Sequence, residues 1–191
     1  MAGTSKRAAR KKSWVALLRG INLGPRNKIS MADLKELFAD LGAEDVETYV
    51  QSGNVLFRSS DARDDLVRAI ENEIDKRLGL QVTVLLRTDA ELAKLVADNP
   101  FGEDEPEATK LHVTFLAERP DRSRAAALDE EQFAPDRFRV TPDAVYLHCP
   151  NGYGRSKLSN AFFEKQLGVA ATTRNWRTVT TLAERAGGAS R

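Results

Sequence analysis

The order of apolar and amphipathic segments constrains the fold of this chain more than any other feature of the sequence. Residues 14–87 predict, in order, a strand, a helix, two strands joined by a tight turn, a second helix and a last strand. This β-α-β-β-α-β order is typical of ferredoxin-like folds, in which the first two strands run parallel. We therefore expect an α+β first half of ferredoxin-like type.

Residues that favour turns and helix ends mark the boundaries of these elements. Ser30 and Asp33 stand where a capping box would begin the first helix, and Gly79 ends the second helix. Residues 52–54, Ser-Gly-Asn, separate the two middle strands, and the glycine can supply the positive φ of a hairpin turn. The turn and cap signals therefore agree with the periodicity.

A similar order of elements returns after residue 110. The second half predicts a strand at 111–117, a helix at 123–132, two strands at 137–141 and 144–148, and helices at 158–167 and about 175–186. It therefore has the same order without the closing strand, followed by a C-terminal helix. The halves share no residue-level identity, so the repeat is one of element order.

The segment between the two halves predicts a connector. Thr88 and Glu91 make a capping box for a helix over 89–97, and the acidic, proline-interrupted residues 99–109 favour a flexible linker or flap. We expect one compact chain in four parts: a disordered basic tail at 1–13, a ferredoxin-like half at 14–87, the connector helix and linker at 88–110, and the second half with its C-terminal helix at 111–191.

Charge is distributed unevenly along the chain. The 29 basic and 28 acidic residues give a formal net charge of +1, but five of the basic residues lie in residues 1–13, which contain no acid. The other 24 basic residues stand against 28 acidic ones, so the rest of the chain carries −4. The tail is either an arm that contacts nucleic acid or an extension that only aids solubility.

The sequence predicts neither secretion nor membrane insertion. The first apolar run covers only residues 14–18, whereas a signal peptide needs about 7–15 apolar residues and a membrane span roughly 18. The single Cys149 cannot form a disulfide within the chain, which fits a reducing compartment. We therefore expect a cytoplasmic protein without a membrane partner, and the oligomeric state is left open.

Residues 152–178 contain the densest group of polar side chains. The glycine-rich residues 152–154 predict a turn from a strand into a helix, with Ser156 as the N-cap. Backbone N–H groups and the helix N-terminus could receive a phosphate or carboxylate there, and Arg155 and Lys157 would add positive charge. The alternative is a turn that only joins the two elements.

Two polar loops of the first half are expected at one edge of its sheet. The loop after the first strand and the hairpin after the second leave the sheet together, because these strands run parallel. Arg19 closes a buried apolar strand and must find an acceptor or reach solvent. It either binds an anion or pairs with a carboxylate or carbonyl inside the fold.

Both regions contribute to one set of candidate ligand-binding residues. Within this set, Trp176 is either a core side chain or a surface on which a base stacks, and Thr173 and Asn175 either bind ligand or cap the last helix. The complete set is Arg19, Asn22, Asn27, Lys28, Gln51, Ser52, Asn54, Tyr153, Arg155, Ser156, Lys157, Asn160, Thr173, Arg174, Asn175 and Trp176.

Signals for a protein nucleophile or a metal site are weak. His112 and His148 lie on different predicted strands, and with one cysteine they make no metal-ligand cluster. His148 and Cys149 are neighbours on a strand and therefore point to opposite faces. Ser156 beside Lys157 has the residue types of a catalytic dyad, but adjacent positions rarely form one. We expect no metal and no cofactor, and we assign no catalytic residue.

Five segments together resemble a bacterial family, the domain-of-unknown-function family numbered 1697. They are VALLRGINLG at 15–24, the helix entry at 28–34, TYVQSGNVLF at 48–57, GYGRSKL at 152–158 and ATTRNWRTV at 171–179. The resemblance implies an α+β fold and a cytoplasmic location. It implies no activity, because the function of that family is unassigned.

Three functions are compatible with these observations. The first is a module that binds an anionic or phosphorylated ligand, a nucleotide or nucleic-acid segment, through charge-assisted arginine contacts. The second is a transferase or hydrolase that acts on a small substrate in the same cleft. The third is a protein-interaction module whose polar motifs hold the two halves together. Unpaired Arg19 and Arg155 in an open cleft would favour the first two, and internal ion pairs would favour the third.

Overall fold

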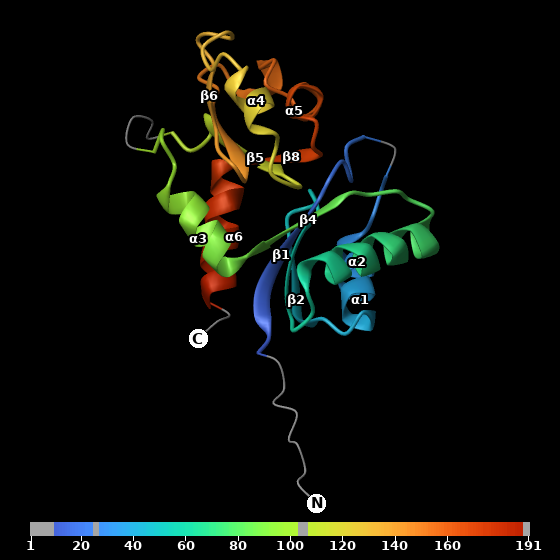
Figure 1. Ribbon diagram of the computed structural model, residues 1–191. Coiled ribbons are helices and arrows are strands. Elements are labelled where there is room, and N and C mark those ends of the chain that lie inside the picture. The colour runs from blue at the N-terminus through green and yellow to red at the C-terminus, as the bar shows by residue number, and fades with distance from the viewer. Residues whose placement is uncertain (1–9, 25–26, 103–106, 189–191) are drawn as a thin grey trace, which may run out of the picture.

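The computed structural model describes residues 10–24, 27–102 and 107–188, which form a mixed α+β fold (Figure 1). The described strands make two four-stranded antiparallel sheets, ordered β2-β3-β1-β4 and β6-β7-β5-β8. The predicted α+β class is therefore confirmed. The first half comprises β1 (Lys12–Leu18), α1 (Met31–Asp40), β2 (Glu44–Tyr49), β3 (Asn54–Ser59), α2 (Arg63–Leu78) and β4 (Val84–Thr88).

The connector and the second half follow the first sheet. The connector helix is α3 (Asp89–Ala97). The second half comprises β5 (Leu111–Leu116), α4 (Arg122–Ala126), β6 (Arg137–Val140), β7 (Ala144–His148), the short 3₁₀ helix η1 (Tyr153–Arg155), α5 (Asn160–Leu167), β8 (Ala171–Asn175) and α6 (Trp176–Gly188).

Local capping residues of the first half lie where the sequence predicts them. The Ser30 hydroxyl accepts a hydrogen bond from the Asp33 amide at 3.0 Å and begins α1. Gly79 ends α2 in the left-handed conformation, with φ 65°. Thr88 and Glu91 form a complete capping box at the start of α3. These helices therefore begin or end at the predicted signals.

Strand β1 begins inside the predicted basic tail. Lys12 lies opposite Ser59 and Ser13 opposite Arg58 in the β1–β3 ladder, so the last two residues of the predicted tail are strand, not tail. The Ser13 hydroxyl also donates to the carbonyl of Ala186 at 3.1 Å. Residues 1–9 of the predicted tail lie outside the described residues.

The second half differs from its prediction in three elements. It contains the closing strand β8, which pairs with β5, where the sequence predicts only a polar segment before the last helix. β8 is hard to recognise in the sequence because two of its three buried positions hold the polar residues Thr172 and Arg174, and only Ala171 is apolar. Helix α4 has only five residues, and α5 begins at Asn160 with Ser159, not Ser156, as its N-cap.

Three apolar clusters hold the fold together. Helices α1 and α2 cover one face of the first sheet, and α4 and α5 cover one face of the second. The other faces of both sheets meet α3 and α6 in a central core, where α3 and α6 pack side by side (Figure 1). Phe101, within the predicted linker, is buried in this core, whereas residues 103–106 lie outside the described residues.

The two halves correspond element by element. Each half closes its sheet with a strand, β4 or β8, that leads directly into a helix of the central core. Thr88 caps α3, and the Asn175 side chain accepts a hydrogen bond from the Thr178 amide at 2.8 Å at the start of α6. Among the described residues, none of the helices is long and apolar enough to cross a membrane.

Candidate functional site

Arg174 joins the two halves through a fully hydrogen-bonded guanidinium. Its side chain comes from β8 and crosses to the first half, and only 8% of it is exposed. All five N–H donors that an arginine offers have an acceptor. Within 2.7–3.0 Å these acceptors are the Asn54 amide oxygen, the Thr172 hydroxyl and the main-chain carbonyls of Leu18, Ser52 and Thr173.

The acceptors of Arg174 are all neutral. Burial lowers the pKa of Arg174 to about 10, which still leaves the guanidinium charged at neutral pH. A buried charge without a counter-ion depends on hydrogen bonds for its compensation. Arg174 therefore holds together three of the motif segments identified in the sequence, those around residues 18, 52–54 and 172–174.

Asn54 and the turn before it are held in a fixed position beside Arg174. The Asn54 side chain is fully buried, and its amide nitrogen donates to the Tyr49 carbonyl at 2.9 Å and the Ser52 hydroxyl at 3.0 Å. The preceding Gly53 has φ 78°, and a Cβ there would lie 2.6 Å from the Ile21 side chain. Only glycine therefore fits at position 53, and this turn serves the structure.

Asn22 performs a similar task in the neighbouring loop. Its side-chain nitrogen donates to the carbonyls of Ile29 at 3.0 Å and Gln51 at 2.8 Å, and its oxygen accepts from the Ile29 amide at 3.0 Å. Asn27 donates to the Gly20 carbonyl at 3.5 Å, and Lys28 is exposed. The two polar loops thus lie together as predicted, but the side-chain amides of Asn22 and Asn27 are bonded to main-chain groups of these loops.

Arg19 forms an internal ion pair. Its Nε and Nη2 each donate to a carboxylate oxygen of Glu164 on α5 at 2.6 Å. Burial raises the pKa of Glu164, but the hydrogen bonds from Arg19 and from the Ala171 amide outweigh it, so that the net pKa is lowered. Of the two alternatives for Arg19, the structure supports pairing within the fold.

A network of contacts brings together three of the predicted residues of the second half, Tyr153, Asn160 and Thr173. The Thr173 hydroxyl donates to the Asn160 side-chain oxygen at 2.6 Å and lies 2.7 Å from the Thr114 hydroxyl. The Tyr153 ring stacks on His112 with 4.7 Å between ring centroids. Burial, the larger effect, raises the pKa of Tyr153, against a hydrogen bond with Thr173. The hydroxyl and amide groups of this network therefore bond to one another, whereas the buried Nδ1 of His112 has no hydrogen-bond partner in the described part of the chain.

The predicted phosphate cradle at residues 152–157 is not formed. The amides of Gly152, Arg155 and Ser156 donate to carbonyls of residues 149, 152 and 153, because this segment winds into η1. The Ser156 hydroxyl accepts from the Leu158 amide at 3.1 Å and does not cap α5. The sequence predicts Arg155 at the N-terminus of the helix. In the structure α5 begins after Ser159, so Arg155 does not lie there.

Arg155 and Lys157 instead line a shallow groove of about 420 Å³ with residues 132–136, Asn151 and Gly152. Within the described part of the chain neither cation has an ion-pair partner.

Trp176 packs against the central core, which agrees with a core role for this side chain. Cys149 is buried, and burial raises its pKa to about 11, so its thiol is protonated at neutral pH.

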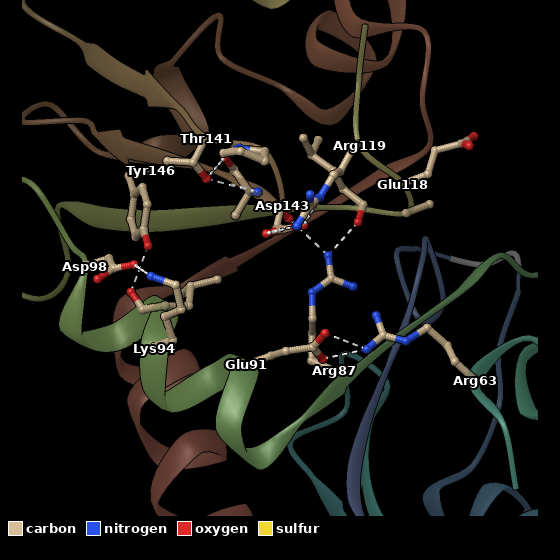
Figure 2. Close-up of a pocket in the computed structure, with 15 residues that line it drawn as sticks. Arg63, Arg87, Glu91, Lys94, Asp98, Glu118, Arg119, Thr141, Asp143 and Tyr146 are labelled. Atoms are coloured by element: carbon tan, nitrogen blue, oxygen red, sulfur yellow. Dashed lines mark hydrogen bonds and ion pairs between the residues drawn. The ribbon is translucent and has the colours of Figure 1, made fainter. Parts of the chain in front are cut away.

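A second pocket, larger than the groove at Arg155 and Lys157, lies elsewhere, between the two halves (Figure 2). It measures about 530 Å³ and is formed by α2, β4 and α3 on one side and by the end of β5 and the β6–β7 hairpin on the other. None of the candidate residues from the sequence lines it. Its polar lining residues include Arg63, Arg87, Glu91, Lys94, Asp98, Glu118, Arg119, Thr141, Asp143 and Tyr146.

Arg87 occupies the centre of this pocket lining (Figure 2). Only 6% of the residue is exposed, and its Nη groups donate to the carbonyls of Leu86 at 2.8 Å, Leu116 at 2.5 Å and Asp143 at 3.0 Å. Burial, partly offset by Glu91, lowers its pKa. Among the described residues its Nε has no acceptor. Three of its five donors are therefore used.

Apart from Glu118, the other charged side chains of the pocket lining are paired with each other. Arg63 donates to both carboxylate oxygens of Glu91 at 2.6 and 2.7 Å, and Arg119 pairs with Asp143 at 3.1 Å. Lys94 pairs with Asp98 on the same helix. The Tyr146 hydroxyl donates to the Leu95 carbonyl at 2.8 Å, and burial raises the Tyr146 pKa to about 12.

Sequence reasoning missed Arg87, although the sequence carries a signal for it. Like Arg19, Arg87 closes an apolar strand and must find acceptors when buried. Its acceptors Leu116 and Asp143 lie 29 and 56 residues further along the chain. The correspondence of Arg87 with Arg174 also depends on β8, which the sequence did not reveal.

The fold is therefore that of a two-sheet α+β protein whose halves meet around the central helices α3 and α6. The chain belongs to a family described as "Protein of unknown function (DUF1697)", whose model matches residues 12–146, which confirms the resemblance. The segments GYGRSKL and ATTRNWRTV lie beyond the matched residues.

A solved structure shares this fold. It is that of the conserved bacterial protein SP0830 from Streptococcus pneumoniae, with a TM-score of 0.74 and 20% sequence identity over 93% of this chain and 99% of that chain. At this identity the likeness concerns the fold alone. No curated protein matches the sequence.

Proposed function

We propose that this protein binds a small anionic ligand in the pocket between its halves, with Arg87 as the anchor. The observation that carries the proposal is a guanidinium more than nine-tenths buried that faces a pocket and has carbonyls, but no carboxylate, as acceptors. Charge-assisted hydrogen bonds to such a group are about twice as strong as neutral ones. Small ligands also bind preferentially at interfaces between domains.

The lining of the pocket favours binding over turnover. Of the described residues that line it, none is a serine, cysteine or histidine, and the Thr141 hydroxyl donates to the Ala144 carbonyl at 2.7 Å. A transferase or hydrolase acting here would have to combine positioning and electrostatics with the carboxylates, Lys94 or Tyr146 of the lining as acid, base or nucleophile. We therefore retain binding as the function and treat the enzyme as the alternative that a turnover assay on a bound ligand would reveal.

The proposal is tested with a panel of anions and one charge-reversed variant. Monocarboxylates, inorganic phosphate, nucleotides, sugar phosphates and a short single-stranded oligonucleotide are compared by thermal shift, since a ligand that binds only the folded protein raises its Tm. Lys94→Glu reverses a charge at the pocket, and Lys165→Glu reverses one on an exposed position of α5. Binding of the active anion should weaken several-fold in the Lys94 variant only.

Two results would overturn the proposal. One is a panel in which no anion raises the Tm at millimolar concentration. The other is an anion that binds equally well to both lysine variants and the unmodified protein, because its site would then lie outside the pocket. Calorimetric titration of the best anion against the three proteins separates these cases.

A second anion site at Arg155 and Lys157 is favoured by a different observation. Both cations line one groove, and neither forms a salt bridge among the described residues. Asp136 lines the same groove, so a phosphate group would meet two positive charges and one negative charge there. We expect weak, salt-dependent binding of an oligonucleotide there. The double variant Arg155→Ala, Lys157→Ala should lower the slope of log affinity against log salt, and an unchanged slope would exclude this site.

We further interpret each half as ferredoxin-like and the working compartment as the cytoplasm. The strand orders β2-β3-β1-β4 and β6-β7-β5-β8 support the first interpretation, since each half places its first strand between its third and fourth. A single cysteine supports the second. Fractionation of cells that produce the native protein, probed with an antibody, would test the compartment.

A further inference from the structure

The internal symmetry of the fold assigns Ala144 the position that Asn54 has in the first half. In the first sheet, Leu17 on β1 lies opposite Asn54 at the start of β3. In the second sheet, Phe115 on β5 lies opposite Ala144 at the start of β7. The arginines correspond in the same register, because Arg87 lies opposite Val15 on β1 and Arg174 opposite Val113 on β5.

The two arginines have main-chain acceptors of the same three kinds, but only Arg174 has side-chain acceptors. Each donates to the carbonyl of the preceding residue, to the last carbonyl of the other half's first strand and to a hairpin carbonyl. Arg174 has two more acceptors, the side chains of Asn54 and Thr172. The corresponding positions at Arg87 hold Ala144 and Leu85, which offer no acceptor.

The space left by the missing amide belongs to the pocket. Ala144 lines the pocket together with Arg87, and its side chain ends at Cβ, where Asn54 continues to the oxygen that meets Arg174. The Nε–H of Arg87 is the donor that corresponds to this contact. A ligand oxygen bound to that N–H would therefore complete at Arg87 the coordination that Arg174 receives from the protein.

We propose that the ligand is a monocarboxylate with an apolar body, whose carboxylate oxygen takes the place of the Asn54 amide oxygen; this inference rests on the proposed function. Arg63, Lys94 and Arg119 each already have a carboxylate partner, so Arg87 is the one cation of the described pocket lining without such a partner. Glu118 adds a further negative charge. The four cations and four carboxylates of the lining therefore sum to zero, so a ligand with one negative charge adds less repulsion than a phosphate dianion with two.

The walls of the pocket supply the apolar contact. Leu95, Leu116, Pro142, Ala144 and the ring of Tyr146 line it beside the charged groups. Its volume of about 530 Å³ lies within the roughly 300–1,000 Å³ of small-molecule sites. An aromatic or aliphatic acid would place its chain or ring against these residues and its carboxylate on Arg87.

The test compares probes that differ in the head group and not in the body. Benzoate, phenyl phosphate and benzamide are titrated calorimetrically at pH 7, followed by acetate, hexanoate and phenylacetate to vary the body. We expect benzoate, hexanoate or phenylacetate to bind at least tenfold more tightly than acetate, and benzoate at least tenfold more tightly than benzamide and phenyl phosphate. Lys94→Glu should weaken the binding of the tightest acid.

Substitution of Ala144 tests the position of the carboxylate. Ala144→Asn supplies the missing acceptor from within the protein, so we expect a higher Tm and at least a tenfold loss of carboxylate binding. Ala144→Leu has the same size without the acceptor, so it should lose binding without the gain in Tm. Ala126→Asn, at an exposed position of α4 outside the pocket lining, is the control and should neither raise the Tm nor change carboxylate binding.

One spectroscopic measurement does not depend on the folding of these variants. The NMR signal of the Arg87 Nε–H, assigned by its loss in Arg87→Lys, should move downfield when the tightest acid is added. Phenyl phosphate that binds more tightly than every acid, in a manner sensitive to Lys94→Glu, would overturn the carboxylate and leave the proposed function standing. If none of the acids moves this signal, the carboxylate inference is overturned. If no probe binds in a manner that Lys94→Glu weakens, both the carboxylate inference and the proposed function are overturned.

Discussion

Arg174 and Arg87 stand at corresponding positions of the two halves and together form the joint between them. We call the end at Arg174 closed, because all of its donors are bonded within the protein, and the end at Arg87 open, because it faces the pocket. At the closed end Asn54 and Thr172 complete the coordination of the guanidinium, whereas Ala144 and Leu85 stand at the open end. The backbone around both arginines is alike. The comparison teaches that two side chains decide whether a buried arginine serves only as a joint or also faces a pocket.

The closed end explains why so many polar motif residues look functional in the sequence. A buried guanidinium that has no counter-ion and faces no pocket needs every donor satisfied, because each unmet hydrogen bond costs about 1–3 kcal/mol. Loops of the first half and a strand of the second must therefore supply acceptors at fixed positions. Asn22, Gly53 and Asn54 meet this structural demand, which the sequence alone cannot separate from ligand binding.

Removing the guanidinium of the closed end should have the largest effect. Arg174→Ala leaves the Asn54 oxygen and three carbonyls without their donor and also leaves a cavity, so we expect a loss of about 3–5 kcal/mol in the free energy of unfolding. Urea denaturation followed by circular dichroism measures it. Arg177→Ala, at an exposed position of α6, is the control. A loss below about 1 kcal/mol would show that the joint does not depend on Arg174.

Removing only the acceptor should make the closed end resemble the open one. Asn54→Ala deletes the hydrogen bonds to Arg174, Tyr49 and Ser52, and we expect a loss of about 2–3 kcal/mol by urea denaturation. Combined with Ala144→Asn, it exchanges the two ends. If Ala144→Asn instead destabilises the protein as much as Asn54→Ala does, the two positions do not correspond energetically.

The ion pair between Arg19 and Glu164 should contribute less and depend on pH. The folded-state pKa of Glu164 lies below its ordinary 4.5, so the stabilisation is present above about pH 4.5 and is lost as the pH falls through the lower folded value. Glu164→Gln should cost about 0.5–1 kcal/mol at pH 7 and almost nothing at pH 3. The exposed Glu36→Gln serves as control, and a difference that persists at pH 3 would contradict an ionic origin.

The smallest change is expected at Arg155, which lies outside both ends of the joint. Its side chain is exposed and has no partner among the described residues, so Arg155→Ala should alter the free energy of unfolding by less than about 0.5 kcal/mol. Differential scanning calorimetry without added ligand measures this. A loss of several degrees in Tm would mean that Arg155 has a structural role, and the second anion site would lose its support.

The order of elements in the first half could be read from periodicity because most of its buried strand positions are apolar. β8 could not, since Thr172 and Arg174 occupy buried positions there and satisfy one another by hydrogen bonds. The rim formed by the two polar loops followed from strand direction. The pocket did not, because its lining comes from segments between Arg63 and Tyr146 that only the packing of the halves brings together.

The central core has a consequence for the time course of synthesis. Val15, Leu17, Leu56 and Leu85 on the inner face of the first sheet are covered in part by α6, the last described helix. About 100 residues separate β4 from the end of α6, and ribosomes add about 5–20 residues per second. The first half therefore waits roughly 5–20 s with an apolar sheet face incompletely covered, which is the interval in which a chain of this design is most exposed to aggregation.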